Sequence, residues 1–148
     1  MLTSDQVLHY HENGYTVPDY RLSDEVLADI RNDHARLISR NPQFRNYCPN
    51  LLAYDLCFLN YARIPKILDM VEQILGSDFA LWNSSFFAKP ACDGQATPWH
   101  QDGEYWPLRP LATCTVWMAI DKATVDNGCL RLIPGSHKQQ MLREHQIN

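Results

Sequence analysis

The stretch Thr97-Pro98-Trp99-His100-Gln101-Asp102 (TPWHQD) decides how the rest of the chain is interpreted. Residues 97–100 have the composition of a short strand, and Gly103 indicates a turn directly after them. His-x-Asp at the end of a strand presents an imidazole and a carboxylate to the same side of the turn. These groups can supply two of the three protein ligands in the 2-His-1-carboxylate site, which holds Fe(II) and leaves three coordination positions open.

The His-x-Asp pattern taken alone is a weak signal. With 6 histidines in 148 residues, roughly 0.5 matches are expected by chance. The alternative interpretation is a solvated turn, in which His100 is exposed and Asp102 closes an Asx-turn. The surrounding residues therefore have to decide between these two interpretations.

Short β-like runs flank the motif on both sides. Residues 79–88 are rich in aromatic side chains, and residues 113–120 (TCTVWMAI) and 129–133 are rich in β-branched and large apolar ones. Runs of this kind, bounded by glycine and proline, predict strands. Together with residues 97–100 they give four expected strands in the second half of the chain.

The sequence of the first half of the chain predicts helices. Thr3 and Gln6 fit a capping box, and Gly14 fits the end of that first helix. Apolar positions at helical spacing predict further helices between residues 23 and 41 and between residues 65 and 76. Helices followed by short strands favour an α+β fold, or a helical cap on a β-barrel.

Composition excludes several classes of protein. The formal net charge of -4 and the absence of a basic stripe argue against a nucleic-acid partner. The apolar runs are far shorter than the ~18 residues of a membrane-spanning helix, and the first residues lack the pattern of a signal peptide. Five cysteines without a C-x-x-C pair favour reduced thiols, so we expect a cytoplasmic protein with neither membrane nor nucleic-acid partners.

Further motifs stand around His-x-Asp in a characteristic order. Lys89-Pro90 precedes it, and a strand containing Trp117, the run Asp126-Asn127-Gly128-Cys129-Leu130 and the run Pro134-Gly135-Ser136-His137 follow. This series resembles the phytanoyl-CoA dioxygenase family, which combines K-P, H-Q-D, a Trp-bearing strand, E/D-N-G-x-L and P-G-S-H. The resemblance is close over residues 79–138 and looser over the helical region before them.

The resemblance implies a fold and a reaction. The family's fold is a double-stranded β-helix, a cupin-like jelly roll, and here N-terminal helices would precede it. Its members use Fe(II), O2 and 2-oxoglutarate to oxidise a second substrate, usually by hydroxylating a small organic molecule, and release succinate and CO2. The alternative function is a non-catalytic or incomplete jelly-roll fragment that binds a small molecule or a partner chain.

The resemblance also carries roles onto individual residues. It implies iron ligation by His100 and Asp102, contact with 2-oxoglutarate by Trp117 and Ser85, and contact with the primary substrate by Gln101 and Tyr105. Purely structural roles also remain open: Trp117 could be a core residue, Ser85 could hydrogen-bond local backbone, and Tyr105 could be part of a packed lid.

The sequence departs from the family pattern after the P-G-S-H motif. The family's second ligand histidine and its basic anchor for 2-oxoglutarate lie further along the chain, so the third iron ligand is left open between His137 and His145. Substitutes for the anchor would be Lys89, Arg109 or Arg131. For His137 a structural role at the Pro134-Gly135 turn is the favoured interpretation.

Two parts are therefore expected, a helical part over residues 1–76 and the first half of a jelly roll over residues 77–148. Four strands cannot close a barrel that uses eight. Three accounts remain open: a piece of a longer protein, a short form that completes its barrel by dimerising, and a relative without activity. The primary substrate and the oligomeric state are not indicated by any residue.

Overall fold

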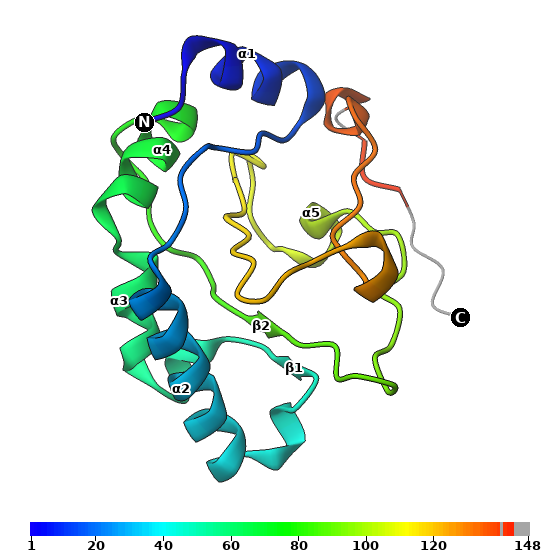
Figure 1. Cartoon of the computed structure of the whole chain (residues 1–148). Coiled ribbons are helices and arrows are strands. Elements are labelled where there is room, and N and C mark those ends of the chain that lie inside the picture. The colour runs from blue at the N-terminus through cyan, green and yellow to red at the C-terminus, as the bar shows by residue number, and fades with distance from the viewer. Residues whose placement is uncertain (140, 144–148) are drawn as a thin grey trace.

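The computed structural model describes residues 1–139 and 141–143. Helices run along one side of the molecule, and extended segments from the second half of the chain fill the other side (Figure 1). The helices of the first half are α1 (Ser4–Asn13), α2 (Asp24–Arg40), α3 (Leu59–Ala62) and α4 (Pro65–Leu75). Three 3-10 turns join α2 to α3, namely η1 (Pro42–Phe44), η2 (Leu51–Ala53) and η3 (Leu56–Phe58).

Helix α1 begins and ends where the sequence predicts. The Thr3 hydroxyl accepts a hydrogen bond from the Gln6 backbone N–H at 3.2 Å, and the Gln6 side-chain oxygen accepts one from the Thr3 N–H at 2.9 Å. This reciprocal pair is the predicted capping box. Gly14 ends the helix with a φ of 84°, a left-handed conformation that glycine adopts without strain.

The other two predicted helices are also confirmed. Ser23 caps α2 by accepting a hydrogen bond from the Val26 N–H at 3.4 Å, and Asn41 follows its last residue. Pro65 stands in the first turn of α4, where a missing N–H costs nothing. Gly76 ends α4 with a φ of 87°.

The sheet is smaller than the sequence predicts. Strand β1 (Tyr47–Cys48) pairs antiparallel with β2 (Phe86–Phe87), with Tyr47 opposite Phe87 and Cys48 opposite Phe86. Of the strand expected over residues 79–88, β2 is the part that forms. Its partner β1 comes from the stretch between α2 and α3.

The strands predicted over residues 97–100, 113–120 and 129–133 are not confirmed in the described part of the chain. These segments are irregular, and between them lie α5 (Asp102–Tyr105), η4 (Val125–Asn127) and, after them, η5 (Ser136–Gln139). High β-propensity does not make a strand without a neighbour to share its backbone hydrogen bonds and cover its faces. The structure therefore shows helices with a two-stranded sheet and does not confirm the predicted jelly roll.

The core lies within the helical part. Leu37 of α2, Cys48 of β1, Leu51 of η2 and Phe58 of η3 form one buried cluster, and Phe86 of β2 packs against it. All hydrophobic residues that are buried within the described chain fall between residues 2 and 67. The extended segments, by contrast, leave many large apolar side chains half exposed.

Polar contacts nevertheless attach the extended segments to the helices. At the end of α1, the Gly135 N–H donates to the Asn13 carbonyl at 2.9 Å, and His137 Nε2 donates to the His11 carbonyl at 3.0 Å. On α2, Arg31 donates to an Asp121 carboxylate oxygen at 3.0 Å. In the view of Figure 1, the segment after α5 (yellow) runs through the centre of the molecule, below α1 and to the left of α5.

Among residues 1–139 and 141–143, no helix has both the length and the apolar character needed to cross a bilayer.

Candidate metal centre

The candidate site is a turn that places His100 and Asp102 side by side. Gln101 has an extended backbone, and α5 begins directly after it at Asp102. His100 Nε2 and Asp102 Oδ1 are 3.2 Å apart, and the two side chains are 37% and 48% exposed. We call these two residues the His–Asp pair. The sequence prediction that both groups face the same side of the turn is confirmed.

A backbone carbonyl fixes the orientation of the imidazole. His100 Nδ1 lies 2.8 Å from the Pro98 carbonyl oxygen. Because a carbonyl only accepts, Nδ1 must carry the proton of this hydrogen bond. In a neutral ring, Nε2 then points its lone pair at Asp102, which is the tautomer that ligates a metal through Nε2.

The geometry of the pair fits a bound cation. A lone pair and a carboxylate that face each other at 3.2 Å need a proton or a cation between them. Two ligands ~2.1 Å from a metal and at right angles lie ~3.0 Å apart. The observed separation is close to that value, so the pair can provide two neighbouring ligands of an octahedral metal.

Two neighbours complete the surroundings of the pair. The Thr115 hydroxyl donates to Asp102 Oδ2 at 3.4 Å, which leaves Oδ1 as the oxygen that faces the imidazole. The Tyr105 ring stands edge-on to the His100 ring, with centroids 6.2 Å apart. Sequence reasoning missed Thr115. The available signal was its position two residues before Trp117, on the same face of the expected strand.

Gln101 connects the turn to a later segment. Its side-chain N–H donates to the Met141 carbonyl at 3.4 Å, and its side-chain oxygen accepts from the Arg143 N–H at 2.8 Å. This amide therefore pairs with the backbone of residues 141–143, much as a strand would. Its expected contact with the primary substrate stays a prediction, as does that of Tyr105.

The two residues expected to contact 2-oxoglutarate occupy exposed positions. Ser85 is exposed just before β2, and Trp117 is 49% exposed. In the described ranges no hydrogen bond, ion pair or ring contact joins either of them to the His–Asp pair. The neighbouring Ser84, rather than Ser85, has a buried hydroxyl. The core position considered for Trp117 is not observed, and both cofactor roles stay predictions.

The third ligand is not found in the part of the chain that the structure describes. Within residues 1–139 and 141–143, no group of three His, Cys, Asp or Glu side chains is arranged to hold a metal ion. His137 donates through Nε2 to the His11 carbonyl, so its observed role is structural, but the bond reaches the end of α1 rather than across the Pro134-Gly135 turn. The other candidate, His145, lies outside the described residues.

The three basic residues considered as anchors differ in their contacts. The Lys89 ammonium donates to the Gln95 carbonyl and, at 3.3 Å, to the Thr97 hydroxyl. Arg109 donates to the carbonyls of Trp106 and Leu108, at 3.1 and 2.6 Å. The Arg131 guanidinium lies over the Trp99 ring, 5.2 Å from its centroid.

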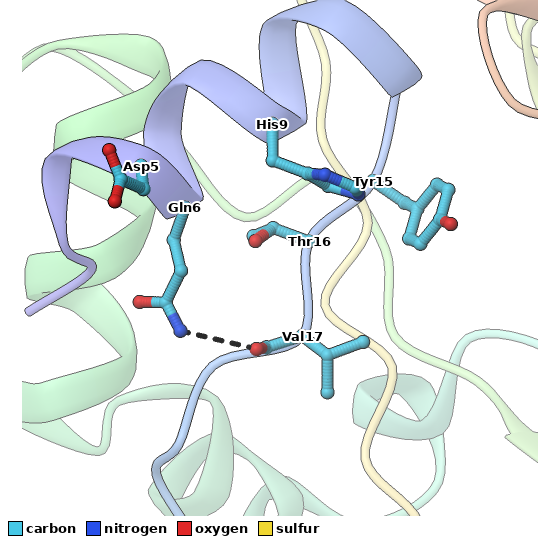
Figure 2. Close-up of a pocket in the computed structure, with 6 residues that line it drawn as sticks. All are labelled: Asp5, Gln6, His9, Tyr15, Thr16 and Val17. Carbon is cyan, nitrogen blue, oxygen red and sulfur yellow. Dashed lines mark hydrogen bonds between the residues drawn. The ribbon is translucent and has the colours of Figure 1, made fainter.

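A surface pocket of about 350 Å³ lies elsewhere, between the first turns of α1 and the chain that follows this helix (Figure 2). Among its lining residues, the Gln6 side chain donates to the Val17 carbonyl at 3.3 Å. His9 and Tyr15 also line the pocket, and their rings stand edge-on with centroids 5.1 Å apart. None of its lining residues belongs to the candidate metal centre.

Comparison with known proteins identifies the family to which the chain belongs. Residues 10–147 match the family profile described as phytanoyl-CoA dioxygenase. A probable phytanoyl-CoA dioxygenase of Caenorhabditis elegans is 35% identical over 179 residues, covering 96% of this chain and 55% of the relative. The peroxisomal phytanoyl-CoA dioxygenase of Homo sapiens is 27% identical, covering 93% of this chain and 48% of the relative.

A bacterial relative has a different name. The ectoine dioxygenase of Bordetella bronchiseptica is 29% identical, covering 93% of this chain and 50% of the relative. The chain spans about half the length of these curated relatives. No solved structure matches it. The profile match covers most of the sequence, from α1 to beyond the P-G-S-H motif, so the chain belongs to the phytanoyl-CoA dioxygenase family.

Proposed function

We propose that this chain provides the iron-binding turn of an Fe(II)- and 2-oxoglutarate-dependent dioxygenase that hydroxylates a small organic substrate. The observation that carries the proposal is the His–Asp pair, with its fixed Nδ1 proton and its 3.2 Å separation. Relatives that are named dioxygenases support the reaction class. Because the names of these relatives include both phytanoyl-CoA and ectoine, the relatives do not indicate which substrate this chain would act on.

Bound iron and 2-oxoglutarate would supply the oxidising power: one oxygen atom of O2 enters the C–H bond of the substrate, and the other enters succinate as CO2 leaves. The residues of the chain position the metal and the two substrates. His100 and Asp102 hold the metal, the Pro98 carbonyl keeps the imidazole in the right tautomer, and the Thr115 hydroxyl orients the carboxylate. In the same proposal, Ser85 and Trp117 contact 2-oxoglutarate, whereas Gln101 and Tyr105 line the substrate side.

We further propose that the irregular segments over residues 97–100, 113–120 and 129–133 are strands of a jelly roll. Their partner strands would come from residues outside the described ranges or from a second chain. The third iron ligand and the basic group for 2-oxoglutarate would come from the same source. Supporting this are the strong β-propensity of these segments and their exposed apolar side chains.

The second candidate function is that of a non-catalytic fragment that binds a small molecule or a partner chain. The lack of a third metal donor in the described ranges favours it. Two protein ligands hold Fe(II) weakly and let first-row metals exchange. Tight binding of one iron per chain would count against this candidate.

Conversion of 2-oxoglutarate to succinate by the purified protein, with Fe(II) and ascorbate, separates the two candidates. The oxygenase proposal expects succinate to form in an iron-dependent way, and expects His100→Ala and Asp102→Ala to reduce it to the protein-free background. His9→Ala is the matched control, because it removes an exposed imidazole on α1. Succinate formation that persists in both site variants, or that is absent from the unaltered protein, would reject the oxygenase.

The location in the cell is a separate proposal. The cysteine usage favours a reducing compartment, and we propose the cytoplasm. Mammalian relatives carry the word peroxisomal in their names, so fractionation of source cells should look for the protein in both compartments.

A further inference from the structure

Gln101 stands between the two residues of the His–Asp pair, and its side chain projects away from them. Its backbone is extended, with a φ of -117° and a ψ of 119°. In extended backbone, neighbouring side chains leave on opposite faces and alternate side chains share a face. Because His100 and Asp102 meet on one face of the turn, the Gln101 amide projects from the other face, which we call the rear of the turn.

The Gln101 amide binds the main chain of a distant segment, residues 141–143. Its side-chain N–H donates to the Met141 carbonyl at 3.4 Å, and its side-chain oxygen accepts from the Arg143 N–H at 2.8 Å. In a parallel pair of strands, one residue bonds to the carbonyl and the N–H that flank the residue opposite it, with the same spacing. The Gln101 side chain therefore takes the place of a strand partner for this segment.

Packing at the next residue of the turn supports the same attachment. A Cβ placed on Gly103 would stand 3.2 Å from the methyl groups of Leu111 and 3.3 Å from a methyl group of Leu142. Leu142 is half-buried, whereas Met141 before it and Arg143 after it are exposed. The segment thus directs its apolar side chain at the turn and is bonded to the turn through its main chain.

We propose that Gln101 is a positioning residue, which fixes the rear of the turn to residues 141–143 and so keeps His100 Nε2 and Asp102 Oδ1 in place for a cation. The inference rests on the proposed function, because it takes the His–Asp pair as the metal site. It comes in addition to the substrate contact proposed for Gln101, and it acts whether or not a substrate is bound. Groups that orient metal ligands from behind commonly change metal affinity by about 10–100-fold.

The attachment links two equilibria. A cation at the His–Asp pair favours the turn geometry that the attachment holds, so metal binding and the attachment of residues 141–143 stabilise each other by the same factor. This reciprocity gives two separate readouts. One is the protection of the Arg143 N–H from exchange with solvent, and the other is the affinity of the chain for a metal ion.

Amide hydrogen exchange, resolved by residue with mass spectrometry, tests the attachment without metal. We expect the Arg143 N–H to exchange about tenfold faster in Gln101→Leu than in the unaltered chain, because its acceptor is removed. Gln139→Leu is the matched control. It removes a glutamine that binds the Arg143 guanidinium at 2.8 Å and keeps the Gln101 amide, so exchange at the Arg143 N–H should be unchanged.

Titration with Mn(II), followed by the EPR signal of the free ion, tests the link to the metal site. Mn(II) suits oxygen ligands in octahedral geometry, so it can stand in for Fe(II) at this pair. We expect Gln101→Leu to weaken Mn(II) binding about tenfold. Leu142→Ala, which leaves every residue of the turn intact, should weaken it in the same direction, and Gln139→Leu should not change it. Bound Mn(II) should slow exchange of the Arg143 N–H in the unaltered chain.

The proposal is overturned if the Arg143 N–H exchanges equally fast in Gln101→Leu and in the unaltered chain. It is also overturned if Mn(II) binds both with the same affinity, or binds neither. Succinate formation judges the oxygenase separately. A Mn(II) site that depends on Gln101, in a chain that forms no succinate with Fe(II) and 2-oxoglutarate, would keep this proposal and reject the oxygenase. Succinate formation together with Mn(II) binding that is unaffected in Gln101→Leu would do the reverse.

Discussion

Single residues define what the His–Asp turn can do. The Pro98 carbonyl holds the proton on His100 Nδ1, and the Thr115 hydroxyl engages the Asp102 oxygen that faces away from the ring. Both contacts leave His100 Nε2 and Asp102 Oδ1 directed toward the same point. The alternative considered from the sequence was a solvated turn with an exposed His100 and an Asx-turn at Asp102. That alternative does not require the carboxylate of Asp102 to lie 3.2 Å from His100 Nε2, as it does here. This geometry accommodates either a proton or a cation between the two groups, and a cation is what the proposed function requires.

Gly14 and His137 form a contact that links the two halves of the chain. A Cβ added to Gly14 would stand 2.6 Å from His137 Nδ1, and the φ of 84° is unfavourable for other residues. We expect Gly14→Ala to lower the free energy of unfolding by about 1–2 kcal/mol, from backbone strain and this clash together. Urea unfolding measures it.

The matched control for this substitution is the same change in a His137→Ala background. With the ring absent, only backbone strain remains, so the cost of Gly14→Ala should be smaller there. Equal costs in the two backgrounds would show that residues 135–137 do not pack on the end of α1 in solution.

Cysteine reactivity should follow environment. Burial, together with the carboxylates of Asp55 and Asp33, raises the pKa of the Cys57 thiol to about 12. Cys92, in contrast, is exposed. Because the thiolate is the reactive form, we expect an aromatic disulfide reagent at pH 8 to modify Cys92 in the native protein and Cys57 only after unfolding. Peptide mapping by mass spectrometry identifies the modified residue, and early modification of Cys57 in a Cys92→Ser variant would contradict this.

At the scale of elements, a polar network fastens α2 to η3 and α3. Arg36 contacts Asp33 at 2.6 Å and Asp55 at 3.2 Å, and the Tyr61 hydroxyl donates to Asp33 at 2.6 Å. The Cys57 N–H and the Arg36 guanidinium bind the Asp55 carboxylate and lower its pKa to about 2. This network lies beside the buried cluster, so it stabilises the part of the fold that has a core.

Acid should therefore weaken the helical part. A carboxyl whose pKa is lower in the folded state stabilises the fold above its unfolded value near 3.8, and this contribution disappears as the pH falls toward 2. We expect Asp55→Asn to lower the free energy of unfolding at pH 7 by about 1 kcal/mol, allowing for solvent screening. It should also flatten the loss of stability between about pH 5 and pH 2.

Urea unfolding over that pH range gives the measurement, with Asp69→Asn as control because Asp69 is an exposed residue of α4 outside the network. A stability curve for Asp55→Asn that runs parallel to that of the unaltered chain would show that the carboxylate contributes nothing pH-dependent.

Elements differ in how far the sequence could predict them. The three longest helices were predictable, because caps such as Thr3 and Ser23, terminal glycines and apolar stripes are all local signals. The strands were not, because a strand needs a distant neighbour: Tyr47 pairs with Phe87, forty positions away, and the segment over residues 113–120 finds no such neighbour in the described chain. The His–Asp turn was predictable since its two residues lie in one turn, whereas the contacts of Gln101 with residues 141–143 depend on the tertiary fold.

The whole molecule is unevenly packed. Within residues 1–139 and 141–143, the buried residues lie between residues 2 and 67, whereas Trp117, Leu130, Leu132 and Ile133 are about half exposed. Half-exposed apolar side chains on unpaired backbone are surfaces that other chains bind. This distribution matches a chain that spans about half the length of its relatives.

Self-association is therefore expected. Sedimentation velocity should show that the weight-average sedimentation coefficient rises with protein concentration. Leu132→Ser should reduce this rise, because it removes apolar area from the extended side. Val17→Ser is the control, since Val17 is 76% exposed on the stretch that follows α1. A single monomeric species at every concentration would contradict the expectation.

Iron binding at the turn is tested most directly by an anaerobic titration of the purified chain with Fe(II) in the presence of 2-oxoglutarate. We expect a weak visible charge-transfer band that saturates at about one iron per chain, with low affinity because two protein ligands are identified. His100→Ala and Asp102→Ala should each abolish the band, and His9→Ala should leave it unchanged. If no band forms, or if it survives both site variants, His100 and Asp102 are not the iron ligands of this protein.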